Sequence, residues 1–113
     1  SLQKKLALYA SALVADVNDG TAPSPVVYHA YKTICKMSDR EIYTQETVNS
    51  HINKAATYGV LESKRTSSGY KTGVHLLFQF NESVEAVIET IEADSSFDEI
   101  KPDDVRSIAA KRL

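Results

Sequence analysis

Residues 44–80 hold the feature that most constrains the fold, a helix pattern followed by a glycine and two strand patterns. The helix pattern places its apolar residues on one face: Val48, Ile52, Ala55 and Ala56. Gly59 follows directly and suits the left-handed conformation with which many helices end. Residues 60–66 and 70–80 have strand character, and turn residues lie between them. We therefore expect a helix followed by a β-hairpin.

Two further helix patterns come earlier in the chain. Residues 2–17 and residues 24–37 both repeat apolar side chains at helical spacing. The second of these helices is expected to begin with Ser24 as its cap and Pro25 as its first helical residue. Residues 18–23 between the two helices are rich in turn formers, so we expect a loop there.

Short segments flank the third helix and the hairpin. Residues 42–43 are expected to form a short strand, and Thr44 is a suitable N-cap for the third helix. Asn81 is expected to cap a fourth helix after the hairpin, and Pro102 to open a last short helix. The fourth helix has an apolar stripe: Val84, Val87, Ile88 and Ile91.

Helices, a hairpin and a further helix in this order are typical of a winged helix-turn-helix, a fold that usually presents its third helix to a DNA major groove. We predict an α+β fold, mostly α, with a three-helix core, a β-hairpin wing and a C-terminal helical extension. At 113 residues the chain has the size of one domain. Residues 1–93 are expected to form the winged-helix DNA-binding domain and residues 94–113 a C-terminal tail with a short helix.

The net charge of −2 hides an uneven distribution along the chain. Residues 1–80 carry nine Lys or Arg and six Asp or Glu, residues 81–104 carry one Lys and nine acids, and residues 105–113 carry three basic residues and no acid. A phosphate backbone could approach the first part but would be repelled by the acidic segment. A merely solvated acidic face explains that segment equally well.

The sequence also indicates a compartment. No apolar run approaches the roughly 20 residues that cross a bilayer, and there is no signal-peptide pattern. Cys35 is the one cysteine, so an internal disulfide is impossible, and a reducing cytoplasm is expected. Because the first residue is Ser and not Met, we expect a fragment of a longer protein.

The outward face of the third helix is the first candidate site. Its polar residues lie opposite or beside the apolar stripe, or in the first turn: Thr44, Gln45, Glu46, Thr47, Ser50, Asn53, Lys54 and Thr57. Short hydrogen-bonding side chains suit base edges and phosphates, and the N–H groups at a helix start suit a phosphate. Any surface helix has a polar face, however, and Glu46 is unfavourable beside phosphates unless it accepts from a cytosine.

The hairpin tip is the second candidate site. Lys64, Arg65, Tyr70 and Lys71 surround the turn that contains Ser68. Cations beside such a turn could reach a DNA backbone or a minor groove. Charges that only protect strand edges are the alternative. We favour the functional interpretation because the cations coincide with the tip that a winged helix uses.

The sequence has no convincing catalytic or metal-binding set. His29, His51 and His75 fall on three elements without metal-ligand spacing, and Cys35 lies on a core face without a cysteine nearby. No phosphate-cradling glycine-rich loop is present. We expect a non-enzymatic fragment that holds no cofactor or metal. Its tyrosines are expected in the core or at its rim: Tyr9, Tyr28, Tyr31, Tyr43 and Tyr58.

Three segments share the order and spacing of a known family. They are Leu6-Ala7-Leu8-Tyr9-Ala10 through Gly20-Thr21-Ala22-Pro23, then Val27-Tyr28-His29-Ala30-Tyr31, then Tyr43-Thr44-Gln45-Glu46-Thr47-Val48-Asn49-Ser50-His51-Ile52 with Gly59-Val60-Leu61-Glu62. In this order they resemble, over about residues 6–92, the C-terminal winged-helix domain of archaeal replication initiators of the Orc/Cdc type (origin recognition complex and cell division cycle proteins).

The resemblance implies a parent AAA+ ATPase that binds repeated origin sequences and helps to load the replicative helicase. ATP and Mg²⁺ would belong only to an upstream module. The resemblance also implies that residues 64–71 form the wing. It further implies that the groove-facing start of the recognition helix is formed by Thr44, Gln45, Glu46, Thr47 and Ser50. The chain departs from the family at Glu46 and Thr47, where members often carry Arg, and its wing is poorer in Arg and Gly.

Two other functions remain open. A transcription regulator of the same fold would usually dimerise to bind two half-sites, with the fourth helix and the tail as its interface. A winged helix that binds protein would suit the negative net charge and Glu46. We expect a monomeric domain that binds double-stranded origin DNA, with the replicative helicase as a partner of the parent protein.

Overall fold

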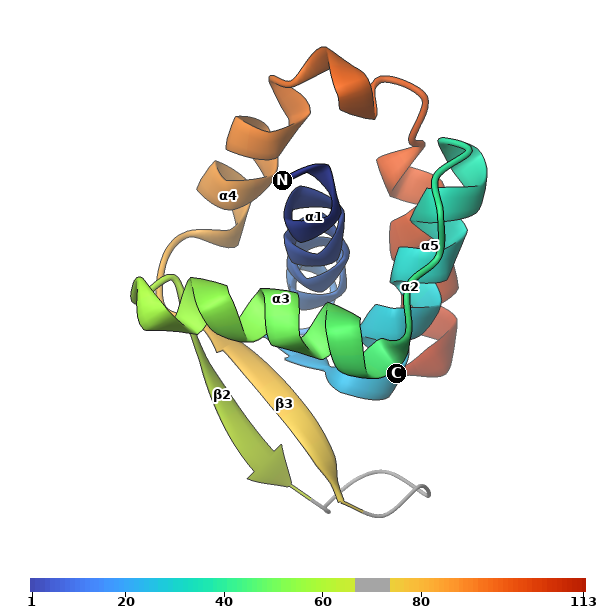
Figure 1. Cartoon of the computed structure of the whole chain (residues 1–113). Helices are drawn as coiled ribbons and strands as arrows, with labels where there is room; N and C mark the ends of the chain where they lie inside the picture. The colour runs from blue at the N-terminus through green and yellow to red at the C-terminus, as the bar shows by residue number, and fades with distance from the viewer. Residues whose placement is uncertain (67–73) are drawn as a thin grey trace.

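The computed structural model describes residues 1–66 and 74–113. Along these residues the elements are α1 (Leu2–Asp16), β1 (Thr21–Pro23), α2 (Ser24–Met37), α3 (Gln45–Thr57), β2 (Leu61–Thr66), β3 (His75–Phe80), α4 (Val84–Glu92), the 3₁₀ helix η1 (Ser95–Phe97) and α5 (Pro102–Arg112). The predicted α+β, mostly helical winged-helix architecture is confirmed (Figure 1). No helix among these residues is both long and apolar enough to cross a membrane.

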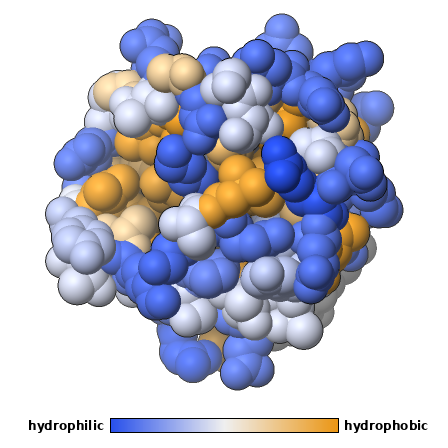
Figure 2. All heavy atoms as spheres, turned by 45° about the horizontal axis from the view of Figure 1, so that its top comes forward, coloured by the Kyte–Doolittle hydropathy of each residue, from blue (hydrophilic) through white to orange (hydrophobic). Residues whose placement is uncertain are grey.

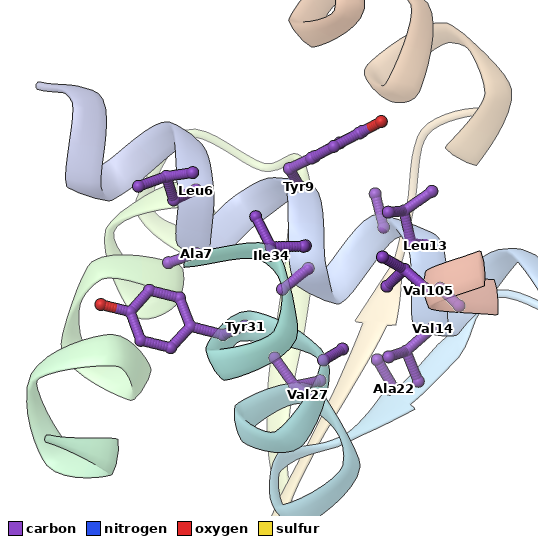
Figure 3. Packing of buried hydrophobic residues seen from close by; sticks show 14 of the residues in the cluster. Leu6, Ala7, Tyr9, Leu13, Val14, Ala22, Val27, Tyr31, Ile34 and Val105 are labelled. Atoms are coloured by element: carbon purple, nitrogen blue, oxygen red, sulfur yellow. The ribbon is translucent and has the colours of Figure 1, made fainter. Parts of the chain in front are cut away.

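The first helix is the centre of the molecule. Every residue of α1 from Leu6 to Ala15 except Leu8 is buried, and in Figure 1 the other helices surround it. A helix that is apolar on most sides is stable only when other elements cover it. Figure 3 shows this packing, in which Leu13 and Val14 meet side chains from β1, α2 and α5. The core is therefore organised around α1.

The sheet has three antiparallel strands in the order β1-β3-β2. β2 pairs with β3 from Leu61 opposite Phe80 to Thr66 opposite His75, as expected for the hairpin. The third strand is β1, within residues 18–23, which were expected to form a loop, so that expectation is wrong. Three residues suffice because Ala22 lies opposite Phe78 and both side chains are fully buried, which holds the strand in place.

The expected strand at residues 42–43 is absent, and tyrosine hydroxyls take its place. The N–H of Tyr43 donates to the hydroxyl of Tyr31 at 2.9 Å, and the hydroxyl of Tyr28 donates to the carbonyl of Tyr43 at 2.9 Å. The Tyr31 hydroxyl in turn donates to Gln3 of α1 at 2.7 Å. The backbone of Tyr43 is thus satisfied without a neighbouring strand. We call this set of contacts around Tyr43 the tyrosine clamp.

Two helix caps also differ from the sequence predictions. Pro23 caps α2, one residue before the expected Ser24. Ser83 caps α4 by accepting from the N–H of Ala86 at 3.3 Å, whereas Asn81 donates to the carbonyl of Gly59 at 3.3 Å. Asn81 therefore joins the two ends of the hairpin instead of starting the helix.

The C-terminal segment packs on the same core as the helices before it. Val105 and Ala109 of α5 are fully buried, and Arg106 forms salt bridges of 2.9 Å with Asp16 of α1 and with Asp103. Phe97 of η1 is buried against Tyr9, with the two rings perpendicular and their centres 5.4 Å apart. The division of the chain at residue 93 stays a prediction.

Candidate nucleic-acid interface

The apolar stripe of α3 packs against the core, and each end of the helix has a cap. Val48 and Ile52 are fully buried against the core. The hydroxyl of Thr44 accepts from the N–H of Thr47 at 3.3 Å, which confirms the predicted cap. Gly59 has a φ of +81°, a conformation that glycine adopts without strain, so the predicted stop is also confirmed.

The tyrosine clamp fixes the start of this helix, because Tyr43 directly precedes the cap. Tyr28 and Tyr31 lie one turn apart on α2, with their rings nearly parallel and 5.9 Å between centres. Burial raises the pKa of Tyr31 above its ordinary value, so the hydroxyl keeps its proton and can both donate and accept. Two hydroxyl groups of α2 therefore bond the backbone of the residue directly before the cap of α3.

The predicted polar face of α3 is open to solvent. Thr47 is partly exposed, and the other candidate residues of this segment are exposed: Thr44, Gln45, Glu46, Ser50, Asn53 and Lys54. Thr57 is exposed as well. Neither η1 nor α5 covers this face, and Figure 1 shows α3 across the front of the molecule with the hairpin extending below it. The helix face and the wing thus form one continuous candidate surface.

The two described cations of the wing lie on opposite faces of the hairpin. Lys64 and Arg65 are consecutive and both exposed, and side chains alternate between the faces of a strand. Lys64 donates to Gln79 across the hairpin at 3.1 Å. Arg65 shares its face with Leu61, whose side chain reaches the core, so Arg65 lies further out on the side of the helices. Ser68, Tyr70 and Lys71 lie outside the described residues.

The acidic segment lies away from this candidate surface. Figure 1 shows α4 on the other side of α3 from the hairpin. The exposed carboxylates on α4 and just before it are Glu82, Glu85, Glu89 and Glu92. One of them, Glu92, accepts from the hydroxyl of Tyr9 at 2.6 Å. A duplex resting on α3 and the wing would therefore avoid most of the negative charge.

Sequence reasoning missed a second group of residues beside the end of α3. Tyr58, expected at the core rim, is 84% exposed, so that expectation is wrong. It lines a hollow together with Lys4 of α1 and Lys54 of α3. The adjacent lysines Lys4 and Lys5 in the first turn of α1 were the signal that could have drawn attention to this side.

The histidines and the cysteine do not converge. Cys35 is fully buried, and burial raises the pKa of its thiol, as expected for an inert core residue. Burial, together with the positive charges of Lys54, Lys4 and the N-terminus, lowers the pKa of His51. Within residues 1–66 and 74–113, no group of three or more His, Cys, Asp or Glu could hold a metal ion.

The fold and the exposed surface of helix and hairpin define a winged-helix domain. The chain matches the family model "CDC6, C terminal winged helix domain" over residues 1–90. It therefore belongs to this family, as the resemblance to Orc/Cdc-type initiators predicted.

Similar curated proteins are archaeal. The chain is 30% identical over 101 residues to ORC1-type DNA replication protein 5 of Halobacterium salinarum, which covers 87% of this chain and 24% of the relative. It is 33% identical over 97 residues to ORC1-type DNA replication protein 14 of Haloarcula marismortui, covering 81% of this chain and 22% of the relative. The chain thus spans about a quarter of the length of these relatives. No solved structure matches it.

Proposed function

We infer that this domain binds double-stranded DNA of replication origins as the accessory to an AAA+ ATPase module of its parent protein. The observation that carries the proposal is the continuous surface formed by the exposed polar face of α3 and the adjacent hairpin cations. α3 would lie in a major groove, with Gln45 reading base edges and Ser50 and Asn53 contacting bases or phosphates. Arg65 would contact the DNA backbone from the side of the hairpin that faces the helices, and Lys64 would reach it from the other face of the hairpin.

The names of the relatives support the proposal, since each is called an ORC1-type DNA replication protein. ATP and Mg²⁺ would be bound outside this chain. The described glycines do not fit such a site, because Gly20 follows α1 and Gly59 follows α3, whereas a phosphate loop runs from a strand into a helix. The domain would act as a monomer, and the parent would contact the replicative helicase.

The test is a titration of the chain against an origin-repeat duplex and a scrambled duplex at two salt concentrations, about 50 and about 200 mM. Tighter binding to the repeat, with affinity for both duplexes falling as salt rises, would support the proposal. Equal binding to both would leave the domain a non-specific DNA binder. Absence of binding at the lower salt concentration would refute it and favour a winged helix that binds protein.

A further inference from the structure

A groove lies where the start of α1, the end of α3 and the outer part of α4 meet. One part is a hollow of about 300 Å³ whose lining includes Lys4, Leu8, His51, Lys54 and Tyr58. The other part is a hollow of about 250 Å³ whose lining includes Leu8, Val60, Glu82, Ala86 and Ile91. Because Leu8 lines both hollows, they adjoin. We call the whole the Leu8 groove.

The groove has an apolar floor that solvent reaches. Leu8 is the one residue between Leu6 and Ala15 that is not fully buried, and Val60 is also partly exposed. On the side where α4 and the end of α3 lie in Figure 1, Figure 2 shows apolar atoms in a hollow rimmed by polar ones. Tyr58 stands at this hollow with 84% of its surface exposed. Exposed aromatic side chains beside an apolar hollow are typical of binding hot spots.

The charges around the groove are divided between its two ends. Lys4 and Lys54 are exposed at one end, and neither forms a salt bridge with a described residue. Lys5 beside them forms a salt bridge of 2.9 Å with Asp94, the N-cap of η1. His51 adds no charge near neutral pH because its pKa is lowered. Glu82 lies at the other end. Two unpaired lysines beside an apolar hollow therefore complement carboxylates that flank an apolar side chain.

A duplex is a poor fit for this groove. Glu82 lines it, and the exposed Glu85 and Glu89 continue along α4, so phosphates would be repelled there. The floor is apolar, whereas surfaces that bind a DNA backbone are polar and positively charged. A hollow of about 300 Å³ is at the lower end of the range for ligand pockets, ~300–1,000 Å³, and suits one bulky side chain of a peptide.

We propose that the Leu8 groove binds a short acidic segment of another protein. The segment inserts a bulky apolar side chain between Leu8 and Tyr58 and places its carboxylates beside Lys4 and Lys54. This site is separate from the polar face of α3 and from the wing, except that Lys54 borders both. The domain can therefore hold a protein partner and a duplex on different sides of α3.

The test is an NMR titration of the isotope-labelled chain with a synthetic peptide that has glutamates on both sides of a Leu-Phe pair. A control peptide carries lysine in place of each glutamate. The expected result is a saturable shift of the Leu8 and Tyr58 signals with the acidic peptide and none with the basic one. Tyr58→Ala should weaken binding about tenfold or more, as removal of an aromatic hot spot does. Because Tyr58 is exposed, this variant should fold normally.

Charge reversal supplies the second arm. Lys4→Glu combined with Lys54→Glu should abolish peptide binding, whereas Lys36→Glu, an exposed lysine of α2 outside the groove, should not change it. Equal binding of the two peptides, or no shift of the groove signals, would overturn the proposal. So would a shift of these signals by a DNA duplex, since the groove would then be part of the DNA footprint. Tyr58→Ala should leave duplex binding unchanged, which separates this proposal from the DNA-binding function.

Discussion

The tyrosine clamp allows a stability prediction that can be worked out from single hydrogen bonds. Tyr31→Phe removes the acceptor for the N–H of Tyr43 and the donor to Gln3. Tyr31 is fully buried, so water cannot easily take the place of its hydroxyl at the Tyr43 N–H. A lost neutral hydrogen bond costs about 1 kcal/mol, and an unsatisfied donor adds to this, so we expect a loss of about 2 kcal/mol in the free energy of unfolding.

This loss converts to a shift in melting temperature. With an unfolding entropy of about 2.1 cal/mol/K per residue, the 113 residues give about 240 cal/mol/K. The Tm of Tyr31→Phe should therefore fall by about 8 °C. Calorimetry or thermal unfolding followed by circular dichroism measures it, and amide exchange should show faster opening at the first turn of α3.

Tyr28→Phe is the matched control for this measurement. It removes one donor to the carbonyl of Tyr43 from a half-buried position where water can replace it, so we expect a loss of about 0.5–1 kcal/mol. If Tyr31→Phe changed the Tm by no more than Tyr28→Phe does, or left exchange at the start of α3 unaltered, the tyrosine clamp would not position the helix.

Three further predictions concern binding and pH. Arg65→Ala should weaken binding to all duplexes and reduce the slope of log affinity against log salt by about 0.9, the value for one lost phosphate contact. Lys71→Ala is predicted from the sequence to behave in the same way, whereas the control Lys101→Ala should leave the slope unchanged. The same slope in wild type and Arg65→Ala would contradict the wing contact. Gln45→Ala should lose preference for the origin repeat by about 1–3 kcal/mol with a smaller change in binding to scrambled DNA, and an unaltered ratio of the two affinities would rule out base reading by this residue. The pKa of His51 is lower in the folded chain than in the unfolded one, so as the pH is lowered from about 7 to about 5 the unfolded chain binds a proton before the folded chain does. The free energy of unfolding and the Tm should therefore decrease over this range. An equally large decrease in the Tm of His51→Gln would show that His51 is not responsible.

The sequence predicted the helices, the hairpin and the caps of α3 because these follow from local patterns. Val48 and Ile52 recur at helical spacing, and both are buried. The hydroxyl of Thr44 suits an N-cap, and the free backbone of glycine suits the left-handed position after a helix. Thr44 and Gly59 occupy these two positions at the ends of α3. Their effects depend on neighbours within one turn, so the local sequence was sufficient.

The errors concern partners that are distant in the sequence. β1 contains Pro23 and follows Gly20, which is a turn composition, and it is a strand only because β3 lies beside it. Tyr43 has a strand-forming neighbour in Ile42, yet its backbone bonds go to hydroxyl groups from α2. Tyr58 comes directly after the last turn of α3, which contains the apolar residues Ala55 and Ala56. The chain turns at Gly59, however, and the ring of Tyr58 is exposed to solvent. None of these outcomes can be read from a window of a few residues.

The candidate site was predictable only in part, for the same reason. The polar face of α3 follows from helical projection, so its exposed residues can be identified from the sequence. Lys4 lies on α1, about fifty positions before Tyr58, and its place beside the end of α3 follows from how the two helices pack. The Leu8 groove is a product of that packing and could not be predicted from a single segment.

The burial of α1 on nearly all sides has a consequence for how the molecule comes apart. α2, α3, α4 and α5 each contact this helix, so none of its turns is freed by the loss of one neighbour alone. Backbone amides in its middle, around Ala10 to Val14, should exchange with solvent only through cooperative opening of the entire chain. Local opening at the exposed surface does not require this event, so it leaves the centre closed.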